Sequence, residues 1–264
     1  MRSHTLPLLA SVATGLVIPS PPTEMTQPVT VHFVPGAFHG PWAFDLIRAE
    51  LASRGFNNTS ASTLPSVRTA DPDVGLYADA AVVVLVVHSY GGAVSSNVVE
   101  GLSVQQRAAA GKPGGIITHV FLTAMALSVG QSALGVFNGT LPPWLEVTDD
   151  GRFYFPSTPE QIFYNDVEDQ ELVAKCVAAL RPEPFKIVQD ASRYAPWTED
   201  NFNVAYIHTE LDQAIDISVQ NSLSSQFPAG SFMATMNAGH SPFLSQPKEL
   251  ADNIIAAHQH LLSN

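Results

Sequence analysis

The chain has 264 residues, of which 45% are hydrophobic and only 14% are charged. Its formal net charge is −12, so we expect no nucleic-acid partner, because an acidic surface repels phosphate backbones. The single cysteine, Cys176, excludes an intramolecular disulfide, and no Cys and His residues show the spacing of a zinc site.

The first 24 residues lack the hydrophobic pattern of a packed element. Leu6–Ile18 is an apolar run that is shorter than the roughly 20 residues of a membrane-spanning helix. Its length suits the apolar part of a secretory signal peptide, but Arg2 is the only Lys or Arg before it and no clean cleavage site follows. We therefore expect residues 1–24 to be a dispensable extension of a cytoplasmic protein, or alternatively the signal peptide of a secreted one. Residues 25–264 are expected to form a single domain with no stable membrane association.

Short runs of β-branched and aromatic residues alternate with helical patterns along the rest of the chain. These runs predict strands at Val29–Val34, Asn58–Leu64, Val82–Val87, Thr118–Thr123, Val204–Thr209 and Phe232–Met236. Apolar residues at helical spacing predict helices at Ala43–Gly55, Gly91–Gly101 and Leu250–Leu262. Because strands alternate with helices, we predict an α/β fold with one doubly wound, mostly parallel sheet.

The connection between the second and third predicted strands is short. Only residues 65–81 separate Leu64 from Val82, and a crossover that includes its helix needs at least about 10–12 residues. Asp71–Ala81 is therefore expected to form a helix of only a few turns, which would leave part of one face of the sheet uncovered.

Residues 128–197 interrupt the alternation of strands and helices. The segment contains several prolines and a high density of aromatic residues, among them Trp144, Phe153, Tyr154, Phe155, Phe163, Tyr164 and Phe185. This density favours an inserted helical lid over the alternative of two ordinary helices on the surface of the sheet.

The most informative segment runs from Val84 to Gly92. An apolar strand leads into Ser89, and two glycines follow at the expected start of a helix, which is the arrangement of a nucleophile elbow. Gly91 and Gly92 allow the helix to pass close to the strand, and the N-terminus of the helix favours negative charge that develops nearby. We predict that Ser89 is a nucleophile rather than a structural turn residue, with Val87 in place of the first glycine of the usual motif.

A nucleophilic serine requires a base and an acid that orients the base, in the chain order serine, acid, histidine. His240 lies in a loop after the last predicted strand and is the predicted base. Glu210, Asp212 and Asp216 all follow the strand Val204–Thr209. Asp212 is favoured as the acid because it lies just beyond the end of the strand, whereas Asp216 is expected to cap the next helix.

Two backbone N–H groups are expected to form an oxyanion hole. One belongs to Tyr90, which follows the nucleophile, and the other to the loop Pro35–Gly40 after the first predicted strand. Ala37 is the best donor in this loop, because Gly36 allows a close approach of the backbone.

With these motifs, the chain resembles α/β-hydrolases of the branch that contains plant methylesterases, hydroxynitrile lyases and their fungal and bacterial esterase-like relatives. The resemblance covers about Val29 to Leu262 and rests on the segments Phe33–Trp42, His88–Gly92, Tyr206–Asp212 and Gly239–Pro247. It implies the α/β-hydrolase fold and a cofactor-independent enzyme. It also implies a triad and an oxyanion hole made of Ser89, Asp212, His240, Ala37 and Tyr90.

The same resemblance favours ester hydrolysis over cyanide chemistry. Related hydroxynitrile lyases have threonine at the position of Gly36 and lysine at the position of Ser241. We therefore predict a serine hydrolase, monomeric or homodimeric, that cleaves a small apolar carboxylic ester, lactone or thioester without a metal or cofactor. Its substrate pocket is expected to be lined by Phe38, Trp144, Phe155, Trp197 and Phe243. The alternatives are a ligand-binding receptor or weakly catalytic relative that keeps the triad, and lyase or other C–C bond chemistry on the same scaffold.

Overall fold

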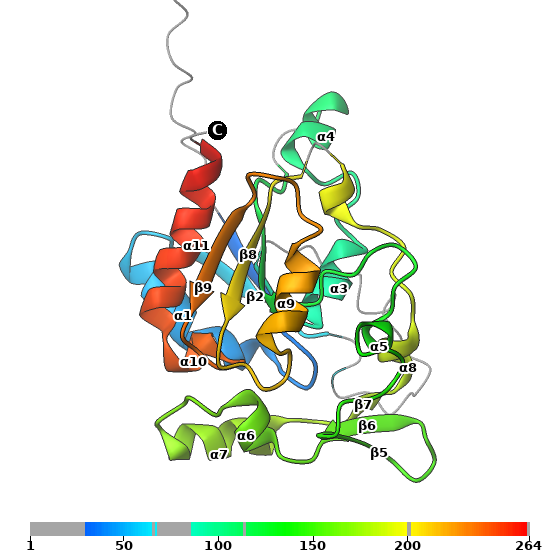
Figure 1. Cartoon of the computed structure of the whole chain (residues 1–264). Helices are drawn as coiled ribbons and strands as arrows, with labels where there is room; N and C mark the ends of the chain where they lie inside the picture. The colour runs from blue at the N-terminus through cyan, green and yellow to red at the C-terminus, as the bar shows by residue number, and fades with distance from the viewer. Residues whose placement is uncertain (1–29, 65–66, 68–85, 113–114, 200–201, 263–264) are drawn as a thin grey trace, which may run out of the picture.

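A computed structural model of the chain describes residues 30–64, 67, 86–112, 115–199 and 202–262. Two predictions lie wholly outside these residues: the N-terminal extension, 1–24, and the short crossover helix, 71–81. Residue 29 and residues 82–85, which belong to two of the predicted strands, also lie outside them. Within the described residues, a six-stranded sheet forms the centre of the molecule, with helices on both of its faces (Figure 1).

All neighbouring strands of the central sheet run parallel, in the order β2-β1-β3-β4-β8-β9. The strands are β1 (Thr30–Val34), β2 (Asn58–Ala61), β3 (Val86–Ser89), β4 (His119–Ala124), β8 (Val204–Thr209) and β9 (Phe232–Met236). This arrangement confirms the predicted doubly wound parallel sheet. Because all the strands point the same way, their carboxyl ends meet at one edge, where the loops of such sheets form binding sites.

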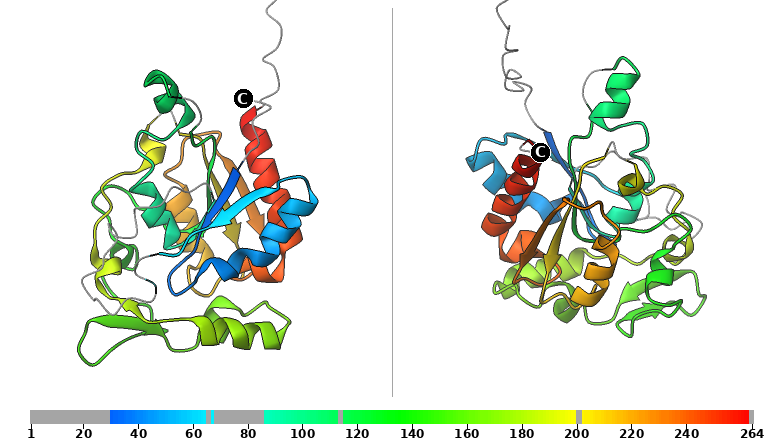
Figure 2. Two further views of the ribbon diagram at one scale, coloured as in Figure 1. Left: turned by 180° about the vertical axis from the view of Figure 1, so that it is seen from behind. Right: turned by 45° about the horizontal axis from the view of Figure 1, so that its top comes forward.

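Helices from different parts of the chain cover the two faces of the sheet. On one side, α1 (Asp45–Ser53) packs against α11 (Pro247–Leu262). On the other side lie α3 (Gly91–Ser96) and α9 (Ile217–Ser224), as the two views of Figure 2 show. The shorter helices of the sheet domain are η1 (Pro41–Phe44), α4 (Val104–Ala109) and α10 (Pro242–Ser245).

The helix α3 is shorter than predicted. It ends at Ser96 rather than at Gly101. The Ser95 and Ser96 hydroxyls both donate to the Gly92 carbonyl oxygen, at 3.0 and 2.8 Å. Such side-chain bonds compete with the regular helical pattern and favour an early end.

The region from β5 to β7 lies across the carboxyl edge of the sheet (Figures 1 and 2). Residues 128–197 contain α5 (Ala133–Val136), β5 (Leu145–Val147), β6 (Phe153–Pro156), α6 (Pro159–Phe163), α7 (Gln170–Ala179), β7 (Glu183–Pro184) and α8 (Lys186–Gln189), and η2 (Pro196–Thr198) ends one residue beyond them. The three strands form a small antiparallel sheet, β5-β6-β7. The sequence predicted helices in this segment but not this second sheet.

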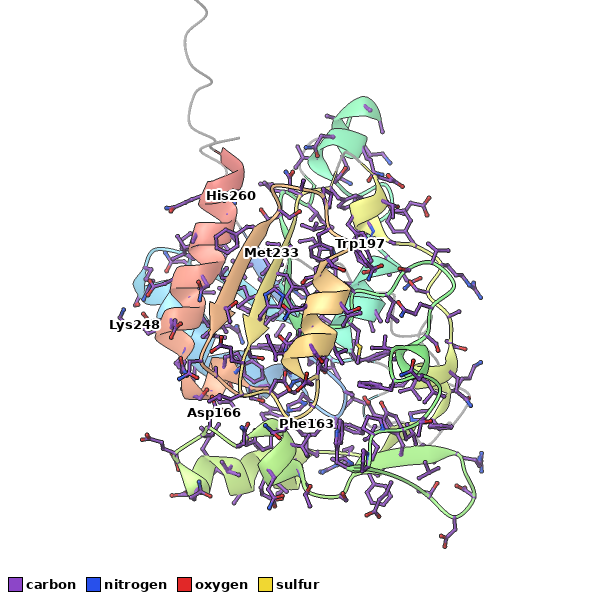
Figure 3. The ribbon with its side chains drawn as sticks, in the orientation of Figure 1. Phe163, Asp166, Trp197, Met233, Lys248 and His260 are labelled. Carbon is purple, nitrogen blue, oxygen red and sulfur yellow. The ribbon has the colours of Figure 1, made fainter. Side chains whose placement is uncertain are left out.

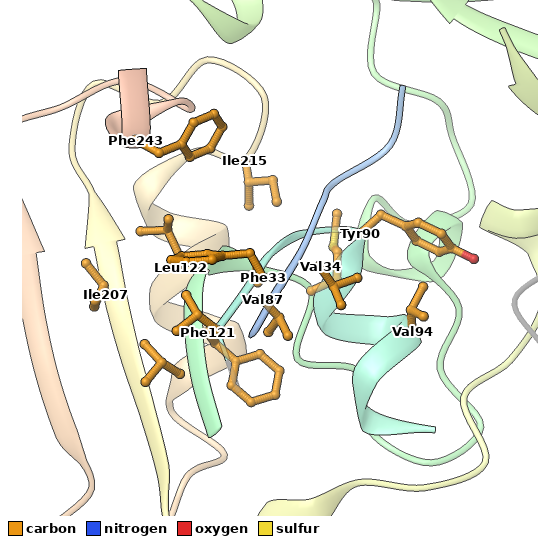
Figure 4. Close-up of a cluster of buried hydrophobic side chains, with 14 of the residues drawn as sticks. Phe33, Val34, Val87, Tyr90, Val94, Phe121, Leu122, Ile207, Ile215 and Phe243 are labelled. Atoms are coloured by element: carbon orange, nitrogen blue, oxygen red, sulfur yellow. The ribbon is translucent and has the colours of Figure 1, made fainter. Parts of the chain in front are cut away.

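The core is apolar on both faces of the central sheet, as the cluster in Figure 4 shows. Every residue of β4 and β8 is buried, including the neighbours Phe121 and Leu122. Since successive residues of a strand point to opposite faces, burial of both neighbours requires that both faces are covered. The sheet is therefore a rigid support for the loops at its carboxyl edge.

Burial lowers the pKa of several histidines that are buried with this core, and three of them are shifted most. The pKa of His39 falls to about 4 and that of His119 to about 3, and the pKa of His88 lies well below its ordinary value. In the unfolded chain these imidazoles take up protons near pH 6.5. Between about pH 6.5 and 4 the unfolded state therefore binds more protons than the folded state, so acidification lowers the free energy of unfolding.

We predict that the free energy of unfolding falls as the pH is lowered from 6.5 to 4.5. His119→Gln should make this fall less steep by about 1.4 kcal/mol per pH unit, which is the slope that the uptake of one proton contributes. Urea unfolding at several pH values measures the slope. Thr118→Val is the matched control, because it changes the adjacent buried position without removing a titratable group. Equal slopes for His119→Gln and the wild type would contradict the assignment.

Candidate active site

Ser89 lies on a sharp turn between β3 and α3. Its backbone is in the left-handed region, with φ 53°, which is uncommon for a residue with a side chain. A Cβ on Gly91 would lie 2.8 Å from the Pro35 carbonyl oxygen, and one on Gly92 would lie 2.9 Å from that of Met125. Both glycines are therefore needed for the close passage of the helix that the sequence predicted.

Ser89, His240 and Asp212 form a continuous chain of hydrogen-bonding groups. His240 Nε2 lies 3.1 Å from Ser89 Oγ, and His240 Nδ1 lies 2.8 Å from Asp212 Oδ2. A carboxylate only accepts, so Nδ1 carries the proton and Nε2 presents its lone pair to the serine hydroxyl. His240 and Asp212 are buried, whereas Ser89 is partly exposed. Ser89 is the last residue of β3, and Asp212 and His240 lie in the loops after β8 and β9, so all three are at the carboxyl edge of the sheet.

The carboxylate of Asp212 accepts five further hydrogen bonds, the longest of them from Gln220 Nε2 to Oδ2 at 3.5 Å. Its Oδ1 receives the backbone N–H groups of Ala214 and Ile215, at 2.7 and 2.9 Å. Its Oδ2 receives the hydroxyls of Thr123 and, at 3.2 Å, Thr209. These donors fix the carboxylate in one orientation and compensate for its removal from water.

The alternative acids have other places in the structure. Asp216 caps α9, and its side chain accepts the Ser218 N–H at 2.8 Å, as the sequence predicted. Glu210 is exposed. Of the three carboxylates considered from the sequence, Asp212 is the one that contacts His240.

The two predicted oxyanion donors border the same cleft as Ser89 and His240. Ala37 lies in the loop after β1, and Tyr90 is the N-cap residue of α3, at the positive end of its dipole. Gly36 brings the first loop close to the turn, since a Cβ at this position would lie 2.6 Å from the Ser89 Cβ. This arrangement places backbone from two loops beside the serine hydroxyl.

Two further histidines hold the loops around His240. His88 Nε2 donates to the His240 carbonyl oxygen at 2.8 Å, and His39 Nδ1 donates to the Ala37 carbonyl oxygen at 2.7 Å. Burial is the main cause of their lowered pKa values, and repulsion from His240, when that ring is protonated, lowers both further. Both imidazoles are therefore neutral near pH 7, and each stabilises a loop that carries a residue of the candidate site.

The cleft beside Ser89 is apolar and has a volume of about 620 Å³ with its open mouth included. Residues 128–197 contribute much of its lining: Ala133, Leu134, Phe137, Leu141, Pro142, Trp144, Leu145, Tyr154, Phe163 and Val188. None of the described residues that line the cleft is an aspartate, glutamate, lysine or arginine.

Three of the five aromatic residues predicted to line this cleft lie elsewhere. Phe38 and Trp144 do line it, but Phe155 does not. On β6 the cleft is lined by Tyr154 instead, because successive residues of a strand face opposite sides. The sequence therefore located the right strand but the wrong face.

Trp197 and Phe243 are core residues. Trp197 packs against Phe121 and Phe227, with ring centroids 5.7 and 5.2 Å apart, and Figure 3 shows it well away from Phe163. Phe243 is fully buried, and its ring lies 4.9 Å from that of His88. Phe243 thus supports the histidines from behind rather than lining the cleft.

Phe163 is a cleft residue that the sequence did not single out. Its ring centroid lies 5.5 Å from that of Trp144 and 5.5 Å from that of His240. Its place in the aromatic-rich segment was the available signal, but many aromatic residues share that property.

Neither a metal centre nor a membrane span is found in the part of the chain that the structure describes. No three His, Cys, Asp or Glu side chains cluster there as metal ligands. No helix there has both the length and the apolar character needed to cross a membrane.

Comparisons with known proteins agree with this geometry. A model of the alpha/beta hydrolase family matches residues 33–253. The chain is 24% identical over 240 residues to the alpha/beta hydrolase nvfD of Aspergillus novofumigatus, covering 84% of this chain and 93% of the relative. These matches confirm the resemblance predicted from the motifs.

Two solved structures have the same fold. A methylesterase from Arabidopsis, MES16, superposes with a TM-score of 0.65 at 22% identity, over 87% of this chain and 99% of that one. Polyneuridine aldehyde esterase superposes with a TM-score of 0.67 at 16% identity, over 89% of this chain and 100% of that one.

We predict that Gly36→Ala destabilises the protein by about 1–3 kcal/mol, the usual cost of overpacking, because its Cβ would overlap the Ser89 side chain. Thermal unfolding measures the effect. Gly135→Ala is the control, since this glycine in α5 is exposed and the nearest atoms to an added Cβ are the Ser132 hydroxyl oxygen, at 3.3 Å, and Gln131 Cγ, at 3.9 Å. Identical melting of Gly36→Ala and the wild type would show that the loop is not held tightly against Ser89.

Proposed function

The chain belongs to the alpha/beta hydrolase family, and we propose that it hydrolyses a small apolar carboxylic ester through a covalent acyl-enzyme. The hydrogen-bonded chain from Asp212 through His240 to Ser89 carries this proposal, because it is the arrangement that activates a serine hydroxyl. The likeness to a methylesterase and to polyneuridine aldehyde esterase supports the same class of reaction.

In the acylation half of the reaction, Ser89 Oγ attacks the ester carbonyl carbon while its proton passes to His240 Nε2. The carbonyl π electrons move to the oxygen, and the N–H groups of Ala37 and Tyr90 stabilise this oxyanion. Asp212 stabilises the imidazolium that forms and holds its tautomer. When the tetrahedral intermediate collapses, the alcohol leaves with the proton from Nε2, and the acyl group remains on Ser89.

In the deacylation half, water takes the place of the alcohol. His240 Nε2 accepts a proton from the water as the water oxygen attacks the acyl carbon. The second tetrahedral intermediate then releases the acid, and the proton returns from Nε2 to Ser89 Oγ. The cycle consumes one ester and one water, and it uses no cofactor.

The apolar cleft supports a neutral, hydrophobic substrate. Residues 128–197 act as the lid in this proposal, since side chains such as Trp144, Tyr154 and Phe163 line the cleft. The absence of Lys and Arg among the described lining residues, together with a net charge of −12, disfavours a polyanionic substrate. Lactones and thioesters present the same carbonyl to Ser89 and belong to the same class.

Two positions favour hydrolysis over lyase chemistry. Gly36 lies against Ser89, and a β-carbon there would overlap it. Ser241 follows His240 and has a short, buried side chain. Related lyases have threonine and lysine at these two positions. This chain therefore lacks, at positions 36 and 241, the threonine hydroxyl and the lysine ammonium group that support cyanide chemistry.

We predict that Ser89→Ala lowers ester turnover by about 10⁴-fold or more with an unchanged fold, because the nucleophile is lost. A panel of aryl and methyl esters measures turnover, and a fluorophosphonate probe followed by peptide mapping locates the labelled residue. Ser53→Ala, at an exposed serine of α1, is the control and should retain activity. Labelling at another residue would contradict the assignment. Thermal stabilisation by esters without turnover would instead indicate a ligand-binding protein.

We predict that Asp212→Asn lowers turnover by about 10⁴-fold with normal folding, because the imidazole loses the acceptor that fixes its tautomer. Asp216→Asn is the matched control. It should retain activity and melt close to the wild type, since asparagine also caps helices well. Steady-state kinetics and thermal unfolding compare the two variants, and the reverse result would make Asp216 the orienting acid.

A further inference from the structure

Three consecutive residues after α6 each bond to a different loop of the candidate site. Tyr164 contacts the loop after β1, Asn165 contacts the loop after β8, and Asp166 contacts the loop after β9. We propose that residues 164–166, here called the clasp, are positioning residues that hold the oxyanion, acid and base loops in their catalytic arrangement. This inference rests on the proposed function, because the loops matter in this way only if they carry the triad.

The first contact of the clasp reaches the oxyanion loop through His39. Since His39 Nδ1 donates to the Ala37 carbonyl oxygen, the neutral imidazole has an unprotonated Nε2, which accepts the Tyr164 hydroxyl at 2.8 Å. Phe38, between the two bonded residues, has a left-handed backbone with φ 68°. Tyr164 thus stabilises a strained loop from which Ala37 is proposed to donate to the oxyanion.

The second and third contacts reach the residues next to the acid and the base. The Asn165 side-chain amide donates to the carbonyl oxygen of Leu211, which precedes Asp212. Asp166 Oδ2 accepts the backbone N–H of Gly239, which precedes His240, at 2.7 Å. Each of these bonds therefore fixes the backbone on which a proposed triad side chain is mounted.

Asp166 makes the tightest of these connections. Its Oδ2 also accepts the Ser245 hydroxyl, at 2.7 Å, so one carboxylate oxygen joins the His240 loop to α10. A Cβ on Gly239 would lie 2.6 Å from Asp166 Oδ1, so the loop and the carboxylate are in direct contact. Hydrogen bonds to an ionised carboxylate are shorter and stronger than those between neutral groups.

The clasp also connects the cleft with the catalytic loops. Phe163, the residue before Tyr164, lines the cleft, and its ring lies beside that of His240. The same short stretch of chain therefore forms a wall of the cleft and braces the three loops. Because a misplacement of about 1 Å can cost about 100-fold in rate, loss of a brace should lower kcat more than it raises KM.

The test compares Asp166→Ala, which removes the acceptor, with Asp166→Asn, which keeps an oxygen in its place. We expect Asp166→Ala to lower kcat by about 10- to 100-fold with KM changed less than about threefold, because the cleft lining is intact. Asp166→Asn should restore most of the lost kcat. Ser245→Ala, which removes one of the two bonds to Oδ2, should show a smaller loss. Glu168→Ala, an exposed carboxylate two residues away, is the control and should behave as the wild type.

Hydrogen–deuterium exchange supplies a measurement that does not depend on turnover. In Asp166→Ala, the Gly239 amide should exchange faster than in the wild type, while the amides of β4 should be unchanged. An unchanged kcat in Asp166→Ala, or an Asp166→Asn variant as slow as Asp166→Ala, would overturn the proposal. If Asp166→Ala does not fold, a wild-type kcat in both Ser245→Ala and Asn165→Ala overturns it.

The experiments can refute the proposed function and the clasp proposal independently of each other. Absence of both turnover and Ser89 labelling in the wild type would refute the ester hydrolase, whereas a working wild type with an equally active Asp166→Ala would refute the clasp alone.

Discussion

The close approach of three backbone segments around Ser89 is the constraint on which the candidate site depends. Gly36 brings the loop after β1 against the serine, Gly91 brings α3 against Pro35, and Gly92 brings it against Met125 after β4. At these three contacts there is no room for a β-carbon. The positions of Ser89 and of the nearby N–H groups are therefore set by backbone packing on a fully buried sheet rather than by the rotamers of mobile side chains. Preorganised donors of this kind stabilise developing charge without a cost of reorientation during the reaction.

A second layer of polar contacts holds the side chains that this backbone carries. Asp212 is buried, and a buried carboxylate with unsatisfied oxygens is destabilising by several kcal/mol. It is satisfied by His240, two backbone N–H groups and the hydroxyls of Thr123 and Thr209. Thr123 has a left-handed backbone, φ 38°, an unfavourable conformation for a β-branched residue. Its bond to Asp212 gives a reason for this strain, since strained residues persist where the surrounding contacts determine them.

The strands of the central sheet and the turn at Ser89 could be predicted because local sequence patterns determine them. Contacts between segments that are distant in the sequence could not be predicted in this way. The strand β8 has the predicted bounds because its apolar run is flanked by turn residues, and the elbow at Ser89 is a property of a few consecutive residues. The face of β6 was mispredicted because strand pairing decides whether Tyr154 or Phe155 faces the cleft, and its partner β7 has only two residues. The bond from Asp166 to Gly239 joins residues 73 positions apart, and neither residue has a local pattern that indicates the other.

The three imidazoles around Ser89 differ in role: His39 and His88 hold loops in place, whereas His240 is the proposed base. Their protonation states fit these roles. His39 and His88 each donate one ring N–H to a backbone carbonyl oxygen, and burial lowers the pKa of both, so they stay neutral near pH 7. This neutrality matters for His240, whose ring lies 4.6 Å from that of His88. If His88 were charged, its repulsion of a protonated His240 would amount to about 4 kcal/mol at an effective dielectric constant of about 20. Neutral neighbours add no such repulsion at His240. Burial of these two histidines thus lowers the free energy of unfolding at acid pH, but it also removes this repulsion from the proposed base, which lies between Ser89 and Asp212.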